Sequence, residues 1–208
     1  MNYTGLKTNI EDICENSFTD DQLAMFTQQA EQKIYNTVQF PALRKVDTGP
    51  LTASTRTYTV PADFLYTYSL AVLDGTTYTY LLNKDVNFLR EAYPDTSVTG
   101  APKHYAYYDE DKLVFGPTPD ENYVIEHTYG YYPESIVTAG TTWLGDAFDS
   151  ALLNGALIEA IRFMKGEQDT IANYEKMFLQ AITLLKQLGD GKLREDAYRS
   201  GQFRSQVG

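Results

Sequence analysis

The stretch Leu113–Pro133, LVFGPTPDENYVIEHTYGYYP, contains an apolar run, a Gly-Pro-Thr-Pro corner and a second run rich in tyrosine. Short runs rich in β-branched and aromatic residues, bounded by glycine and proline, are typical of β-strands. We therefore predict two strands that form a hairpin here, with the corner at Gly116–Pro119 setting their register.

The same strand-like texture extends from about Thr55 to Tyr132. Further strand-like runs are RTYTV, FLYTYSLAVL, TYTYLL and HYAYY. Asp74-Gly75 stands between two of them and predicts a hairpin turn, since both residue types tolerate a positive φ. One short helix is expected over Asn83–Tyr93, followed by a polar loop.

Helical spacing dominates on both sides of this segment. We expect a helix over Gly5–Asn16 and a second one that begins at a Thr19 capping box and reaches as far as Val38. A third helix is expected from Thr142 or Asp146 to Lys165, and a fourth from Asp169 to Gly189. The last two must be antiparallel because the loop between them is short.

This order of elements predicts an α+β fold rather than alternating βαβ units. We expect a helical bundle of two N-terminal and two C-terminal helices, an inserted antiparallel β subdomain and an extended C-terminal tail. The predicted domains are residues 1–54 for the N-terminal helices, 55–140 for the β-rich insert, 141–189 for the C-terminal helix hairpin and 190–208 for the tail.

Bulk composition excludes several classes of protein. The 208 residues carry a formal charge of -11, which argues against a surface that wraps nucleic acid. The single cysteine excludes an internal disulfide framework. The N-terminus lacks the apolar core of a signal peptide and no apolar run is long enough to span a membrane, so we expect an unexported protein without a membrane partner.

No catalytic constellation is visible in the sequence. The chain has no phosphate-binding loop, no dinucleotide fingerprint, no zinc-protease motif and no nucleophile elbow. The acidic run Asp109-Glu110-Asp111 lacks the ligand spacing of a calcium loop and indicates a solvated turn. We predict no catalytic residue, metal or cofactor; the enzyme-class alternative is an acidic hydrolase with its site around His104, Asp109 and His127.

The seventeen tyrosines raise the question of what their rings contact. In the run from Tyr123, one alternating face carries Tyr123, Tyr129 and Tyr131. Base stacking is disfavoured, because stacking platforms come with many Lys and Arg residues and this segment has few. Tyrosine is favoured both in cores and at protein interfaces. We take these three tyrosines as a candidate interface of the β subdomain; whether they face that subdomain or a neighbouring protein stays open.

Several segments together resemble the head-to-tail adaptor (connector) proteins of short-tailed bacteriophages. They are TVPADFL, the Gly-Pro-Thr-Pro corner, the Tyr-Tyr-Pro-Glu exit after the last strand and TTWLGDAFDS at the start of the C-terminal helices. The resemblance covers roughly Leu6–Leu188. It implies a virion protein of the neck or tail, made in the host cytoplasm, that forms a ring of twelve copies between portal and tail. It also implies a lumen for DNA passage during genome ejection, and the tail nozzle and tail fibre proteins as further partners.

The segment after Gly189 has its own predicted role. Its apolar residues are too sparse to bury a face of their own, so we expect it to order on a partner, which the resemblance identifies as the portal protein. The candidate portal-binding residues are Leu193, Arg194, Tyr198, Arg199, Phe203 and Arg204. The alternative within the same class is another neck, tail-completion or nozzle-associated protein.

Overall fold

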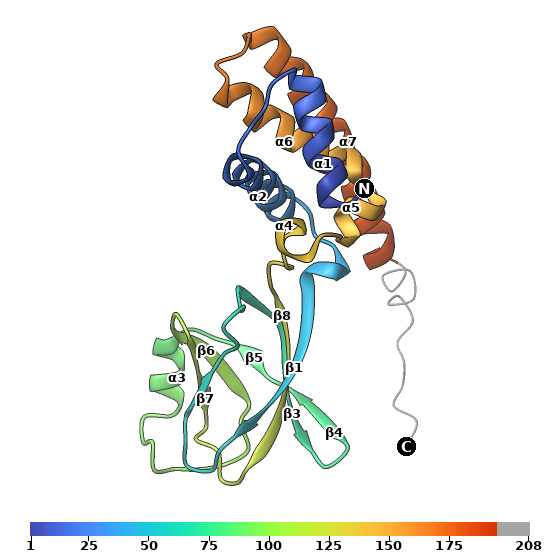
Figure 1. Ribbon diagram of the computed structural model, residues 1–208. Coiled ribbons are helices and arrows are strands. Elements are labelled where there is room, and N and C mark those ends of the chain that lie inside the picture. The colour runs from blue at the N-terminus through green and yellow to red at the C-terminus, as the bar shows by residue number, and fades with distance from the viewer. Residues whose placement is uncertain (195–208) are drawn as a thin grey trace. The chain divides into compact units, whose positions relative to one another are not determined.

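The computed structural model describes residues 1–194, and the side chains of residues 1–189. The chain divides into two compact units, which are described separately below. One unit combines residues 1–43 with residues 132–194 and is helical; the other, Arg44–Tyr131, is built mainly of strands (Figure 1). The predicted α+β class is confirmed. No helix within residues 1–194 has the length and apolarity needed to cross a membrane.

The helical unit is organised around one buried helix. Its elements are α1 (Tyr3–Cys14), α2 (Asp20–Thr37), the short 3-10 helix η1 (Pro41–Leu43), α4 (Ile136–Ala139), α5 (Trp143–Ala147), α6 (Asp149–Phe163) and α7 (Gln168–Arg194). Helix α6 contacts α1, α2 and α7. It buries apolar residues around most of its surface, which agrees with the broad apolar arc of its sequence.

The start of α2 confirms the predicted capping box. The Thr19 hydroxyl accepts a hydrogen bond from the Gln22 backbone N–H, and the Gln22 side chain accepts one from the Thr19 backbone N–H. These two bonds satisfy backbone donors that the first helical turn leaves without a partner in the helix.

Several helix boundaries differ from the prediction; the short helix expected over Asn83–Tyr93, for example, covers Val86–Ala92. The expected helix from Thr142 or Asp146 is broken at Phe148, whose φ of -140° and ψ of 40° are not helical, and this break separates α5 from α6. Helix α1 begins two residues early, where Asn2 caps it. Helix α7 does not end at Gly189 but continues to Arg194. A Cβ atom on residue 189 would lie 2.5 Å from the Gln39 carbonyl oxygen, so the glycine there permits a close approach rather than a helix end.

The β unit contains two four-stranded sheets. Its elements are β1 (Arg44–Leu51), β2 (Thr57–Thr59), β3 (Tyr66–Asp74), β4 (Thr77–Tyr80), β5 (Leu82–Asn83), α3 (Val86–Ala92), β6 (His104–Asp109), β7 (Lys112–Gly116) and β8 (Tyr123–Gly130). Sheet A has the order β1-β8-β3-β4 and is antiparallel throughout. Sheet B has the order β2-β7-β6-β5, and only its β5–β6 pair is parallel.

The predicted β7–β8 hairpin is wrong. Strand β7 lies between β2 and β6 in sheet B, whereas β8 lies between β1 and β3 in sheet A. The corner at Gly116–Pro119 carries the chain from one sheet to the other, because its two prolines have no N–H to continue a ladder. The predicted hairpin at Asp74-Gly75 is confirmed, with Asp74 opposite Thr77.

Strand β1 was not expected, because RKVDTGPL contains two cations, a glycine and a proline. It forms the edge of sheet A, where Pro50 is opposite Val124. An edge strand tolerates a proline because one row of its backbone groups has no neighbour to pair with. The segment assigned to N-terminal helices therefore ends at Leu43 in the helical unit, and the strand that follows belongs to the β unit.

The two sheets enclose a shared apolar core. Sheet A contributes side chains such as Leu70, Val72 and Ile125, and sheet B contributes Leu113 and Phe115. Helix α3 covers part of the outer face of sheet B, where Leu89 packs against Ala106 and Val114. Sheet A has a second, outer face that carries exposed side chains.

Candidate partner-binding surfaces

The three tyrosines predicted as an interface do not share one environment. Tyr129 is 1% exposed and Tyr123 is 7% exposed, so both rings lie in the core of the β unit. Tyr131 follows β8 and is half-buried, with the Lys45 ammonium 5.5 Å from the centre of its ring. Of the two possibilities left open by the sequence, Tyr123 and Tyr129 therefore pack within their own unit.

The hydroxyl groups of these buried tyrosines donate hydrogen bonds to carboxylates. Tyr129 donates to Asp63 at 2.8 Å, and Tyr123 donates to Asp120 at 2.7 Å. Burial and the hydrogen bond to Asp63 raise the pKa of Tyr129 to about 12. Burial also raises the pKa of Tyr123, with the Asp120 carboxylate adding to the effect. Both phenols are thus neutral donors that fix loops against the core.

The face of β8 that points away from the core carries its even-numbered residues. Val124 is 49% exposed, and its neighbours across the sheet are Pro50 on β1 and Leu73 on β3, which in turn is opposite Tyr78 on β4. The next row places Glu126 beside Ala71, which is opposite Tyr80. We call this surface the outer tyrosine face; its exposed large side chains are Val46, Tyr66, Tyr78, Tyr80 and Val124.

Strand β4 adds an open edge to this surface. All four of its residues, Thr77–Tyr80, are exposed, and it is the last strand of sheet A. Such an edge presents backbone N–H and C=O groups that a partner strand can pair with. The outer tyrosine face and the β4 edge together provide both apolar contact area and backbone hydrogen-bonding groups.

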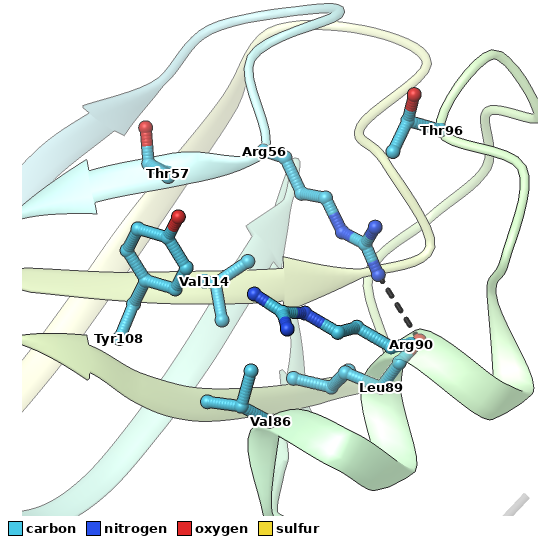
Figure 2. Close-up of a pocket in the computed structure, with 8 residues that line it drawn as sticks. All are labelled: Arg56, Thr57, Val86, Leu89, Arg90, Thr96, Tyr108 and Val114. Atoms are coloured by element: carbon cyan, nitrogen blue, oxygen red, sulfur yellow. Dashed lines mark hydrogen bonds between the residues drawn. The ribbon is translucent and has the colours of Figure 1, made fainter.

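A pocket lies on the outer face of sheet B beside α3. Its volume is about 240 Å³, and its lining residues are Arg56, Thr57, Val86, Leu89, Arg90, Thr96, Tyr108 and Val114. Figure 2 shows both arginine side chains extending over the apolar Val114 and Leu89. The pocket thus combines an apolar floor with two cations, in a unit that has seven Lys and Arg residues against twelve Asp and Glu residues.

The helical unit exposes an apolar stripe on α7. Met177 is 49% exposed, Leu184 is 64% exposed and Leu188 is 49% exposed. Their spacing of seven and four residues places all three on one flank of the helix. Another side of α7 packs inward, where Ile182 and Leu185 lie in the core of the unit. We call Met177, Leu184 and Leu188 the α7 stripe.

The residues of the hydrolase alternative are not brought into one site. His127 lies in sheet A and is fully buried, with Nε2 2.9 Å from the Thr67 hydroxyl. His104 lies in sheet B, where its Nδ1 is 2.9 Å from the Tyr93 hydroxyl. The Asp109 carboxylate accepts a hydrogen bond from the Glu110 backbone N–H. Burial lowers the pKa of both histidines. Among the described residues, no three His, Cys, Asp or Glu side chains are grouped so as to hold a metal ion.

In a comparison with protein families, the SU10 adaptor protein model matches residues 1–205. The chain belongs to the SU10 adaptor protein family. It is thus a phage adaptor protein, and the resemblance to phage head-to-tail adaptors drawn from its sequence is confirmed. A comparison with curated proteins gave no match.

The candidate portal-binding residues of this SU10-family adaptor fall outside what the structure can test. Leu193 and Arg194 are in the last turn of α7, where only the backbone is described. Tyr198, Arg199, Phe203 and Arg204 lie outside the described residues. Their proposed role therefore stays a prediction.

Three surfaces of the adaptor were missed from sequence. The outer tyrosine face depends on which alternating face of β8 points inward, and both faces carry large residues. The α7 stripe has a visible signal, because Met177, Leu184 and Leu188 extend the apolar arc of that helix beyond what one packing face requires. The Arg56–Arg90 pocket has no signal in the sequence, since it joins residues 34 positions apart.

Proposed function

We propose that this protein is a non-enzymatic structural component of the virion that forms a ring between the portal and the tail of a phage. The match of the SU10 adaptor family to residues 1–205 carries this proposal. In it the helices α1, α2, α6 and α7 act as one bundle that builds the wall of a twelve-membered ring. The β unit binds tail components, and DNA passes through the lumen without sequence-specific binding.

The α7 stripe supports self-assembly through the helical unit. Three half-exposed apolar side chains on one flank of a helix lose contact with water when a second copy covers them, which favours association. Ring contacts are heterologous, so this flank would pack on a different surface of the next copy.

Charge supports the passage of DNA through a ring of this protein. The formal charge is -11 for the whole chain, so an assembly of many copies repels phosphate on average. A lumen that does not adsorb the backbone lets DNA move during ejection, whereas clustered lysine and arginine would retain it.

The decisive experiment measures assembly on the portal. The adaptor is mixed with the portal protein of the same phage, and the complex is measured by size-exclusion chromatography with light scattering and imaged by electron microscopy. We expect twelve copies on the portal. Six-fold or three-fold averages would instead favour a nozzle-associated or tail-completion protein.

Variants of the α7 stripe test the ring contact. The triple change Met177→Gln, Leu184→Gln and Leu188→Gln should abolish ring formation while shifting monomer stability by only about 0.5 kcal/mol per position, because about half or more of each side chain is already exposed to water. A matched control changes exposed residues of the same helix that face away from the stripe: Lys176→Gln, Thr183→Ala and Lys186→Gln. Equal loss of assembly in both triples would contradict a role of the stripe.

A truncation tests the tail. Since α7 continues to Arg194, the deletion should remove residues 195–208 and leave the helix whole. We expect loss of portal attachment with an unchanged helical circular-dichroism signal. Full-affinity docking of the truncated protein would refute a portal-binding role of residues 195–208.

A further inference from the structure

The pocket beside α3 is formed because this short helix covers only part of sheet B. Thr57 on β2 and Val114 on β7 are directly opposite each other, so both point to the outer face of the sheet. Ala106, opposite Val114 on β6, is covered by Leu89 of α3. Beyond the helix a hollow of about 240 Å³ remains, with the half-exposed Tyr108 on one side.

Arg56 is held in this hollow by two backbone carbonyls. Its Nε donates to the Phe115 carbonyl at 2.8 Å, and its Nη2 donates to the Leu89 carbonyl at 3.2 Å (Figure 2). Both acceptors are neutral, so they orient the guanidinium group without neutralising its charge. Arginine has five N–H groups, and among the described residues three of those on Arg56 have no acceptor. The Arg56 side chain is therefore a cation held in one position, with N–H donors that a ligand can use.

Arg90 brings a second cation to the same hollow. It follows Leu89 on α3, and Figure 2 shows its guanidinium group over Val114, on the same side of the sheet as that of Arg56. None of the ion pairs within the described part of the chain includes either arginine; those pairs involve Lys7, Lys33, Lys45, Lys112 and Arg162. Two arginines without a carboxylate partner are unusual on a unit with this excess of acidic residues.

The chemistry of the lining specifies the ligand. Guanidinium groups bind carboxylates through paired, charge-assisted hydrogen bonds. The floor of Val86, Leu89 and Val114, with the Tyr108 ring beside it, favours an apolar group attached to that carboxylate. A volume of about 240 Å³ fits one or two side chains and not a folded domain.

We propose that this pocket binds a carboxylate of a partner protein, at a chain end or on an Asp or Glu side chain, together with the apolar side chain next to it. Nucleic acid is disfavoured as the occupant because the β unit has twelve acidic residues against seven basic ones, and phosphate binding requires many cations. The preference for a carboxylate stands on the pocket alone; the choice of a protein as its source rests on the proposed adaptor function.

Small probes test the pocket on the full chain. Backbone amide signals of Thr57 and Val114 are followed by NMR during titration with N-acetyl-leucine, which has a carboxylate next to an apolar side chain. N-acetyl-leucinamide is the neutral probe of the same shape. We expect saturable shifts with the first and none with the second. Equal binding of the two probes would overturn the proposal.

Two further probes separate the carboxylate from other anions. Inorganic phosphate and a short oligothymidine are titrated under the same conditions. We expect both to perturb the pocket less than N-acetyl-leucine does, since neither has an apolar group to cover the floor. Tighter binding of either one would overturn the assignment to a protein carboxylate.

A variant isolates the role of the cations. Arg90→Gln should weaken N-acetyl-leucine binding about tenfold, the effect expected from losing one charged hydrogen-bonding group. Arg90 is exposed, so the variant should fold, whereas Arg56→Gln also loses the bonds to Phe115 and Leu89. Lys103→Gln, an exposed cation of the same unit outside the pocket, is the matched control and should bind normally. Unchanged binding by Arg90→Gln would refute the proposal.

The outcome is separable from that of the proposed function. Arg90→Gln leaves the α7 stripe intact, so it should still form rings on the portal. If the rings fail to form in the wild-type protein but the probe binds, the proposed ring function fails and the pocket assignment stands.

Discussion

Acidification should destabilise the β unit through one buried histidine. His127 is fully buried, with the rings of Phe64 and Tyr129 5.3 and 5.2 Å from its own. Burial lowers the pKa of His127 to about 4, although the nearby Asp47 carboxylate acts in the opposite direction. Its Nδ1 has no hydrogen-bond partner within the part of the chain that the structure describes. The neutral ring is therefore the form that the fold accommodates.

The direction in which stability changes with pH follows from which state, folded or unfolded, binds more protons. In the unfolded chain a histidine takes up its proton near pH 6.5, whereas His127 in the folded protein does so only near pH 4. Between these values the unfolded state binds more protons, so stability falls as the pH falls through this window. The expected loss between pH 7 and pH 5 is about 2 kcal/mol, and it approaches about 3 kcal/mol near pH 4.

Denaturant titrations over this pH range measure the effect when unfolding of the β unit is followed by near-ultraviolet circular dichroism of its tyrosines. The variant His127→Gln keeps a polar group that can bond the Thr67 hydroxyl but cannot titrate. Subtracting its pH profile removes the contributions of His104 and of the carboxylates. NMR of the His127 ring gives its pKa directly. A His127 pKa near 6.5 in the folded protein, or parallel pH profiles of wild type and variant, would refute this reasoning.

Three further predictions concern single contacts. Thr19→Ala removes the α2 cap and should cost about 1 kcal/mol in thermal or chemical unfolding of the helical unit. Glu31→Ala should cost about 2 kcal/mol in the same assay, because the buried Ile136 N–H loses its acceptor at 2.9 Å, whereas Glu31→Gln should retain most of the stability. Gly130→Ala places a Cβ atom 2.6 Å from the Tyr66 ring, so Tyr66 must move; we expect changed tyrosine circular dichroism and a loss of about 1 to 3 kcal/mol.

The sequence predicted elements best where local chemistry alone decides them. The capping box at Thr19 and the turn at Asp74-Gly75 both form as expected, because each depends on residues within three or four positions. The helix break at Phe148 was missed, since no glycine or proline marks it. Strand β1 was missed because its glycine, proline and charges are acceptable only at a sheet edge.

The candidate surfaces also combine features that the sequence indicated with features that only the tertiary structure decided. The tyrosine content of β8 indicated large contact areas, but the direction in which each ring points depends on the second sheet that covers it. Tyr123 and Tyr129 are in the core, while Tyr78 and Tyr80 on β4 are exposed. An alternating pattern with large residues on both faces does not say which face is inside.

By itself, the sequence determined the α+β class, the helical flanks around a strand-rich segment and the relationship to phage adaptors, because composition, periodicity and motif order are properties of the chain alone. The tertiary structure decided that Leu113–Pro133 crosses between two sheets, that its odd-numbered tyrosines Tyr123 and Tyr129 are buried, and that Arg56 and Arg90 share a pocket. These features depend on contacts between residues far apart in sequence, and no local pattern records which distant partner a strand or side chain will meet.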